Sequence, residues 1–334
     1  MSAALRLLFL VPLLLPVSAG QFPAARAEHI FTYHVQLGGA VLYGGYGADG
    51  SGLADTWIYD TQWHLLSTEH SPGARWGHCA TYDEAQQAIV LFGGTTTSMT
   101  TTVVLSDTWL FDGAEWHQVS TAVSPPARTQ AALAYDPQRG VSVLYGGQDT
   151  LGQPLSDTWE FDGSAWNPVE TATGPEAGLY AHAMVYDPQE KTLLLFGGTD
   201  GSYDYANTWV LDDQGWVQRS SSNSPYPRRE HVLVYDGNRR QVLLYGGEHN
   251  TPLADTFAWT GESWQLVQAS AARPPARSGH AACYDTAAGR VLLYGGWNEQ
   301  ENCMADLWSL DLGGWALLTP ASHVFFMTLP YIAR

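Results

Sequence analysis

A pair of adjacent glycines recurs along the chain at a nearly constant spacing. The pairs begin at Gly44, Gly93, Gly146, Gly197, Gly246 and Gly295, so that successive copies are 49, 53, 51, 49 and 49 residues apart. A period near 50 residues that fills a chain indicates stacked copies of one supersecondary unit. The chain of 334 residues is long enough for two domains, but repeated units can share one closed ring.

Alignment on the glycines exposes further repeated positions. Histidine stands 15 residues before the pair, with alanine in the third repeat (His29, His78, Ala131, His182, His231, His280). Arginine stands three residues before that position, with leucine in the fourth repeat (Arg26, Arg75, Arg128, Leu179, Arg228, Arg277). Tyrosine follows the histidine position by four residues (Tyr33, Tyr82, Tyr135, Tyr186, Tyr235, Tyr284). Six copies of one pattern predict six copies of one structure.

Each repeat predicts four short strands. The first carries the histidine and the tyrosine, and the second is apolar throughout, as in residues 291–294, which favours burial on both faces. The third begins at an acidic or amide residue (Asp55, Asp107, Asp157, Asn207, Asp255, Asp306), and the fourth begins at a tryptophan (Trp63, Trp116, Trp166, Trp216, Trp264, Trp315). Four strands cannot bury both faces alone, so we expect the sheets to pack face to face in a ring.

The double glycine after an apolar strand, followed by a spaced aromatic residue and a spaced tryptophan, resembles the kelch repeat, and the Asp-Thr-Trp and Pro-Pro-Ala-Arg variants look most like exported bacterial kelch proteins within the galactose-oxidase-like superfamily. The resemblance covers residues 26–318 and implies an all-β, six-bladed propeller with four antiparallel strands in each blade. Four positions depart from the pattern, namely Ala131, Leu179, Phe257 and Thr260. Because every repeat is whole, we expect the ring to close between complete blades.

The two ends do not match the repeat. Residues 1–20 are typical of a secretory signal, with Arg6 before an apolar run and small residues at its end, so we expect cleavage after Ala19 or after Ala27. This predicts a secreted or periplasmic protein without a membrane span, because the apolar run is too short to cross a bilayer. Residues 319–334 are predicted to form either a strand that patches the closure of the ring or a loose tail.

Charge and cysteine content exclude several classes of partner. The formal net charge is −18, which argues against binding to a nucleic-acid backbone or to an anionic lipid surface. Three cysteines are too few for a disulfide framework. We expect a monomer without a cofactor.

The repeated arginines admit two interpretations. In kelch propellers this position lies at the mouth of the ring, and the resemblance implies that Arg75, Arg128, Arg228 and Arg277 could form a positive patch that holds carboxylates. Alternatively, each arginine pairs with the aspartate at the start of the third strand or caps a loop.

Residues that depart from the repeat are better candidates for ligand binding, because the fold does not require them. Trp76 follows a repeated arginine, and Trp297 follows a double glycine. The loops between the second and third strands differ in every repeat and supply Tyr203, Tyr205, Glu248, Asn298 and Glu299. Variable loops on a rigid scaffold are common binding sites, and aromatic residues beside carboxylates suit a sugar or a peptide.

The repeated histidines invite a metal-binding interpretation, but one histidine in each repeat is also the pattern of a structural contact copied around a ring. No catalytic residue and no metal ligand is predicted, because the sequence contains none of the familiar nucleophile, zinc-binding or phosphate-binding motifs. The sequence therefore favours a non-catalytic module that binds a protein, a peptide or a carbohydrate through its loop-bearing face. The alternative is a sugar-processing enzyme of the galactose-oxidase-like type with its site in the central mouth.

Overall fold

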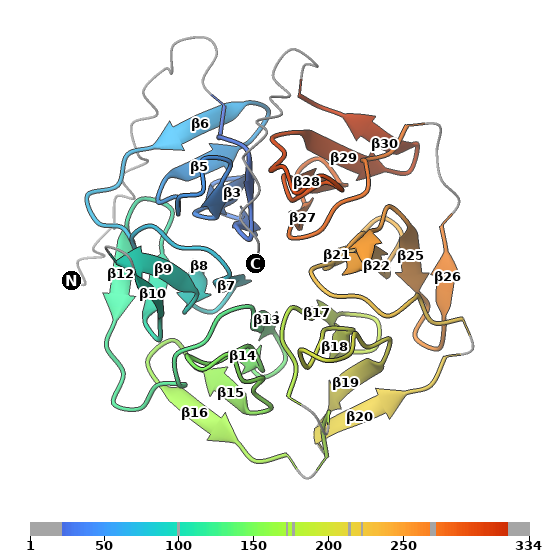
Figure 1. The fold of residues 1–334 in the computed structure, drawn as a ribbon, viewed down its shortest axis with the longest axis horizontal. Coiled ribbons are helices and arrows are strands. Elements are labelled where there is room, and N and C mark those ends of the chain that lie inside the picture. Colours follow the sequence, from blue (N-terminus) through green and yellow to red (C-terminus); the bar gives the residue numbers. More distant parts are fainter. Residues whose placement is uncertain are drawn as a thin grey trace, which may run out of the picture.

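The computed structural model describes residues 22–319, except for 99–100, 172, 176–177, 213–214, 222 and 268–271. Six four-stranded antiparallel sheets surround a central axis as the blades of a propeller (Figure 1). The prediction of an all-β, six-bladed propeller is therefore confirmed. The predicted signal peptide and all of the predicted C-terminal tail except Thr319 lie outside the described residues.

Each blade takes its four strands consecutively from one repeat, with the first strand innermost. Blade 1 contains β2 (Ile30–His34), β3 (Gly39–Tyr43), β5 (Thr56–Tyr59) and β6 (Trp63–Leu66); blade 2 contains β7 (Cys79–Asp83), β8 (Ala88–Phe92), β11 (Thr108–Phe111) and β12 (Trp116–Val119); and blade 3 contains β13 (Ala132–Asp136), β14 (Val141–Tyr145), β15 (Thr158–Phe161) and β16 (Trp166–Val169). Blade 4 contains β17 (Ala183–Asp187), β18 (Thr192–Phe196), β19 (Thr208–Asp212) and β20 (Gly215–Arg219); blade 5 contains β21 (Val232–Asp236), β22 (Gln241–Tyr245), β25 (Thr256–Trp259) and β26 (Trp264–Leu266); and blade 6 contains β27 (Ala281–Asp285), β28 (Arg290–Tyr294), β29 (Leu307–Asp311) and β30 (Gly314–Leu317).

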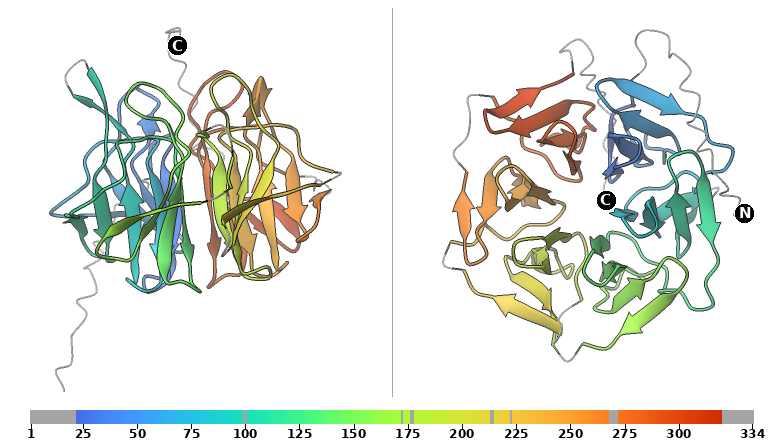
Figure 2. Two further views of the ribbon diagram at one scale, coloured as in Figure 1. Left: turned by 90° about the horizontal axis from the view of Figure 1, so that it is seen from below. Right: turned by 180° about the vertical axis from the view of Figure 1, so that it is seen from behind.

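Three short ladders involve the loops that join the second and third strands; two lie within such a loop, and the third pairs one of these loops with the segment that leads into blade 1. They are β1 (Arg26–Ala27) with β4 (Tyr46–Gly47), β9 (Thr95–Ser98) with β10 (Thr101–Val104), and β23 (Glu248–His249) with β24 (Thr251–Pro252). The β9–β10 hairpin accounts for the longest step between repeats and projects from one side of the ring (Figure 2). These loops all lie on the face of the ring that carries the linkers between blades.

The glycine pairs join neighbouring blades. The amide of the second glycine in each pair donates a hydrogen bond of 2.8–2.9 Å to the carbonyl of the repeated arginine, or of Leu179, in the next blade. The first glycine has a φ of 62–67°, and a Cβ there would lie 2.4–2.9 Å from that same carbonyl oxygen. Only glycine combines this backbone conformation with so close an approach. The double glycines that recur in the sequence are therefore the residues through which neighbouring blades make contact.

A second set of hydrogen bonds forms a closed backbone belt at the inner rim. The residue just before each histidine position has a φ of 53–62° and donates its amide to its counterpart in the preceding blade, at 2.7–3.0 Å. The six members of the belt are Glu28, Gly77, Gln130, Ala181, Glu230 and Gly279. Because the bond from Glu28 to Gly279 has the same form as the other five, the ring closes between whole blades, as predicted.

The tryptophans that begin the fourth strands tie the outer part of the ring together. Trp116, Trp166, Trp216 and Trp264 each donate the indole N–H to the threonine that begins the third strand of the preceding blade, at 2.8–3.1 Å. Trp63 faces blade 6, where Leu307 replaces that threonine, and its buried Nε1 has no hydrogen-bond partner among the described residues. At this position the contact between blades 6 and 1 is thus apolar, whereas the four tryptophan–threonine contacts just described are polar.

This difference predicts unequal costs for one substitution. Trp166→Phe removes a buried hydrogen bond to Thr108, whereas Trp63→Phe removes an N–H group that is already unpaired. We expect Trp63→Phe to cost about 1–2 kcal/mol less in the free energy of unfolding than Trp166→Phe. Denaturant unfolding of both variants measures the difference, and equal costs would contradict the assignment of these bonds.

Candidate functional site

The repeated arginines do not form an open positive patch. Their side chains are 0–2% exposed, and each guanidinium lies against the aspartate that begins the third strand of its own blade. The pairs are Arg26–Asp55, Arg75–Asp107, Arg128–Asp157, Arg228–Asp255 and Arg277–Asp306, all bidentate with N–O distances of 2.6–3.0 Å. The structure therefore corrects the patch interpretation of Arg75, Arg128, Arg228 and Arg277, because pairing within the blade engages their charges.

The pair of Arg277 and Asp306 shows how the ionised state of the carboxyl is favoured. Burial opposes ionisation of Asp306, but the hydrogen bonds and the charge of Arg277 outweigh it and hold the pKa of that carboxyl below its ordinary value. The same arginine donates a hydrogen bond of 2.8 Å to the carbonyl of Gly295, and the indole of Trp308 donates to Asp306 at 2.6 Å. This network holds the linker that leads into the blade in place, so these arginines have a structural role.

The wall of the mouth is built from three positions in each blade, and all three vary. The first follows the repeated arginine (Ala27, Trp76, Thr129, Tyr180, Arg229, Ser278), the second is the belt residue before the histidine, and the third follows the double glycine (Tyr46, Thr95, Gln148, Thr199, Glu248, Trp297). The first and third positions of each blade pair as antiparallel bridges. The repeated backbone thus presents a different set of side chains at the mouth in every blade.

Two adjoining cavities occupy this mouth. The larger, about 1030 Å³, is lined by residues of blades 3 to 6, including Tyr180, Arg229, Glu230, Glu248 and the loop after Trp297. The smaller, about 290 Å³, is lined by residues of blades 6, 1, 2 and 3. Gln130, Gln148 and Trp297 line both. The volume of the larger cavity is at the upper end of the range typical of small-molecule sites.

Three aromatic side chains and one carboxylate gather at the smaller cavity. The ring of Tyr46 meets the ring of Trp76 edge to face, with centroids 5.4 Å apart, and lies 6.2 Å from the ring of Trp297. Glu28 lines the same cavity and accepts a hydrogen bond of 3.1 Å from the side chain of Gln130. Gly279 makes room for Trp297, because a Cβ there would lie 2.8 Å from the indole ring. We call Glu28, Tyr46, Trp76 and Trp297 the aromatic corner.

The mouth is acidic. Five glutamates line the two cavities (Glu28, Glu230, Glu248, Glu299, Glu301), and the single cationic side chain among the lining residues is Arg229. Arg229 is itself engaged by Asp204 at 2.9 Å and by Glu248 at 2.7 Å. The cavities therefore carry an excess of negative charge, which favours cations over carboxylates.

The structure brings together five of the residues predicted from the variable positions. Trp76, Glu248, Trp297, Asn298 and Glu299 all line the mouth. Tyr203 lies apart at the tip of its loop and is 72% exposed. Tyr205 donates its hydroxyl to Asp200 and lines a separate cavity under the linker into blade 4.

Seven further residues that line the mouth were not predicted from the sequence, namely Glu28, Tyr46, Gln130, Gln148, Tyr180, Arg229 and Glu230. The signal for them was present, because each stands directly beside a repeated residue and differs between repeats. Variation at a fixed position of a repeat marks side chains that the fold does not require. Trp76, Glu248 and Trp297 were predicted from positions of the same kind in other repeats, so the same criterion applied to every repeat would have included these seven residues.

The five repeated histidines are buried between blades. Each packs edge-on against the last aromatic residue of the second strand in the preceding blade, as His78 does against Tyr43 with centroids 5.7 Å apart. Burial, helped by the charge of Arg75, lowers the pKa of His78 to about 3. Within the described part of the chain, no group of three or more His, Cys, Asp or Glu side chains lies close enough to hold a metal ion. Cys79, Cys283 and Cys303 are buried, and none of the three forms a disulfide with another described residue.

Comparison with known proteins identifies a family and a distant relative. A family described as the Attractin/LZTR1 β-propeller matches residues 40–213, which is just over half of the chain. An F-box/kelch-repeat protein of Arabidopsis thaliana is 31% identical over 130 residues, covering 33% of this chain and 26% of the relative. The chain therefore spans about a quarter of the length of that relative. No helix among the described residues is both long and apolar enough to cross a membrane.

Proposed function

Because the chain belongs to the Attractin/LZTR1 β-propeller family, a kelch-type fold typical of binding modules, we propose that it is a non-catalytic binding protein whose mouth captures a cationic side chain of a protein or peptide partner. The observation that carries the proposal is the aromatic corner, where three aromatic rings and Glu28 surround a cavity of about 290 Å³. An ammonium or guanidinium group suits this arrangement, because aromatic faces and a carboxylate both attract positive charge.

The wider mouth supports the same partner. Its excess of glutamates attracts a basic segment, and the larger cavity beside the corner offers room for the neighbouring residues of a peptide. The net charge of −18 for the whole chain adds a long-range attraction for basic partners. Export, which rests on residues 1–20, remains part of the proposal, and the partner is then expected outside the cytoplasm.

Glu28→Gln tests the proposal with little change of shape, because the amide retains the size of the side chain. We expect the affinity for a peptide with one central lysine or arginine to fall about tenfold or more, since a charge-assisted contact of about 1.5–3 kcal/mol is lost. Trp76→Ala is expected to weaken the same peptide by a similar factor. Fluorescence anisotropy with the lysine peptide, and with matched peptides that carry leucine or glutamate instead, measures the effect.

Glu84→Gln provides a control of matched charge. Glu84 is exposed and lies in the turn between β7 and β8, whereas the mouth is formed by the loops after β8, at the other end of that strand. This variant should bind the lysine peptide as the unmodified chain does. If leucine and glutamate peptides bind as tightly as the lysine peptide, or if Glu28→Gln has no effect, the mouth does not select cations.

A further inference from the structure

Blade 4 lacks the arginine–aspartate pair that the other five blades share. Leu179 stands at the arginine position and Asn207 at the aspartate position, so both members of the pair are replaced together. Loss of one member alone would leave an unpaired charge in a buried site, whereas joint replacement leaves a neutral one. The carbonyl of Gly197 also loses the guanidinium that binds its counterparts in the other blades.

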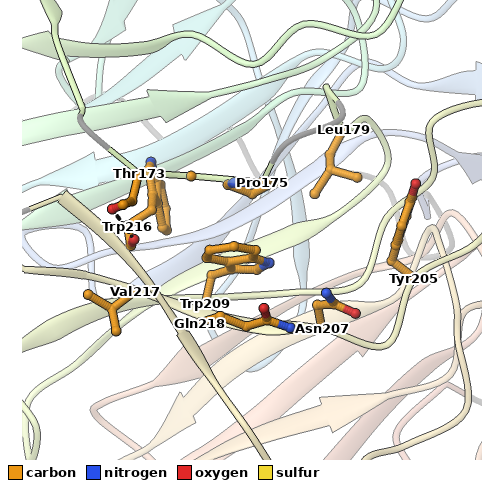
Figure 3. A pocket seen from close by; sticks show the side chains of 10 residues that line it. Thr173, Pro175, Leu179, Tyr205, Asn207, Trp209, Trp216, Val217 and Gln218 are labelled. Atoms are coloured by element: carbon orange, nitrogen blue, oxygen red, sulfur yellow. Dashed lines mark hydrogen bonds between the residues drawn. The ribbon is translucent and has the colours of Figure 1, made fainter.

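A cavity of about 810 Å³ opens at this place. Figure 3 shows the indole of Trp209 in its middle, with Thr173 and Pro175 on one side and Asn207 and Gln218 on the other. None of its ten lining residues carries a charge. The volume is within the range of small-molecule binding sites, which is about 300–1,000 Å³.

Two hydrogen-bond donors that are satisfied elsewhere in the ring lack a partner here. The counterparts of Trp209 in blades 1, 2, 3 and 6 donate the indole N–H to the strand aspartate at 2.6–2.7 Å. Trp209 faces an amide instead, and its Nε1 has no acceptor among the described residues. The lining of the cavity therefore contains an aromatic donor without its usual acceptor.

Tyr145 is the second such donor. Its counterparts Tyr43, Tyr245 and Tyr294 donate the hydroxyl to a backbone carbonyl of the linker into the next blade. The acceptors are the carbonyls of Gly73, Pro274 and Pro23. The hydroxyl of Tyr145 is buried and has no partner in the described part of the chain. Its ring packs on Trp216, which lines the cavity, with centroids 5.0 Å apart. An unpaired buried hydroxyl costs about 1–3 kcal/mol. The loss of the usual contact between Tyr145 and the linker thus accompanies the loss of the arginine–aspartate pair in blade 4.

We propose that this cavity is a second binding site, separate from the mouth, and that it takes an uncharged saccharide. The face of Trp209 suits the apolar face of a sugar ring, and the side-chain amides of Asn207 and Gln218 can both donate to and accept from its hydroxyl groups. The absence of charged lining residues disfavours acidic and basic ligands. The ligand occupies space that the buried guanidinium occupies in the other blades.

The double variant Leu179→Arg with Asn207→Asp tests the site by restoring the pair of the other blades. The new guanidinium should occupy the part of the cavity beside Asn207 and replace polar neutral lining with an ion pair, and the new carboxylate should engage the indole N–H of Trp209. The probes are neutral disaccharides that carry terminal glucose, galactose or mannose, selected on a glycan array and titrated by isothermal calorimetry. We expect the unmodified chain to bind at least one of them and the double variant to bind it at least tenfold more weakly.

Trp209→Ala keeps the test valid if the double variant does not fold. It should abolish saccharide binding, whereas Trp159→Ala, the matched change in blade 3, should not. Independence from the mouth is checked with Glu28→Gln, which should bind the saccharide normally, and with the double variant, which should bind the lysine peptide normally. The proposal is overturned if no neutral disaccharide binds at millimolar concentration, if charged saccharides bind more tightly than neutral ones, or if the restored pair leaves binding unchanged.

Discussion

Lowering the pH from 7.5 to 5.5 is expected to remove about 7 kcal/mol from the free energy of unfolding of this protein. About 7 kcal/mol comes from five histidines, namely His29, His78, His182, His231 and His280, which are 5–6% exposed. His34, whose pKa burial lowers to about 4, acts in the same direction. A loss of this size is comparable with the whole stability of an ordinary domain, about 5–15 kcal/mol. We therefore expect acid unfolding well above the range in which carboxylates titrate.

The physical cause is that each histidine is held neutral in the folded protein. Burial, the largest cause, lowers the pKa of His29, His231 and His280 well below the ordinary value, and nearby arginine charges act in the same direction. Burial likewise lowers the pKa of His182 to about 3. The ring nitrogens of all five form no hydrogen bond of ordinary geometry with the described residues. A backbone carbonyl near each ring, such as that of Tyr294 beside His29, favours the proton but offsets only part of the cost of burial.

The sign follows from the direction of these pKa shifts. Below an unfolded pKa near 6.5, the unfolded chain binds protons that the folded protein cannot bind, so stability falls as the pH falls. Above about pH 7 both states are neutral at these sites and the contribution is complete. Between pH 7.5 and 5.5 each histidine contributes a loss of about 1.4 kcal/mol, and five contribute about 7 kcal/mol.

Urea unfolding at pH 7.5, 6.5 and 5.5 measures this dependence. His182→Asn provides the comparison, because it removes one titrating ring from an interface that lacks the neighbouring histidine at Ala131. The variant should be less stable at pH 7.5. Between pH 7.5 and 5.5, however, its free energy of unfolding should fall by about 1.4 kcal/mol less than that of the unmodified chain, because one titrating histidine is gone. A free energy of unfolding that stays constant between pH 7.5 and 5.5 would contradict the account.

Removing the guanidinium of Arg277 is expected to cost about 3–5 kcal/mol, because Arg277→Leu leaves the carboxylate of Asp306 buried without its partner. The side chains of Arg277 and Asp306 are 0% and 6% exposed, and they form two hydrogen bonds of 2.8 and 2.6 Å. The carbonyl of Gly295 loses a donor as well. The variant therefore combines an uncompensated charge with an unpaired acceptor.

The double variant Arg277→Leu with Asp306→Asn should recover much of that loss. It reproduces the combination of Leu179 and Asn207, which blade 4 already tolerates. Neutral replacement of both members of a buried ion pair is often nearly neutral or even stabilising, whereas loss of one member is costly. The pair is thus expected to be strongly coupled.

A double-mutant cycle in urea, with Arg277→Leu, Asp306→Asn and the combined variant, measures the coupling free energy. We expect about 2–3 kcal/mol, within the range for directly contacting residues. Additive effects of the two single substitutions would show that the guanidinium and the carboxylate do not stabilise one another. Strong coupling between the two positions also accounts for the joint occurrence of Leu179 and Asn207 in blade 4.

The architecture was predictable because it is periodic. A unit that recurs six times must solve the same packing problem six times, and the glycine pairs that define the repeat are the residues at which neighbouring blades touch. The position of Leu307 in place of threonine was equally visible in the sequence, but its consequence for Trp63 was not. That consequence depends on which blades become neighbours when the ring closes.

The mouth was predicted only in part. Trp76 and Trp297 lie 221 positions apart in the chain, and both line one cavity because blades 6, 1 and 2 meet there. The repeated arginines drew attention as surface cations, yet all five are buried with their aspartates. The sequence offered both interpretations, and burial decided between them.

The repeat itself determined the class of fold, the number of blades and the order of strands, since hydrophobic periodicity and glycine spacing act locally and are copied along the chain. Tertiary structure decided which of the varying residues share a cavity, which charges are neutralised and where two partners are lost together, as at Leu179 and Asn207. The physical reason is that charge pairing and burial depend on distances between blades, and those distances are set only when the ring has closed.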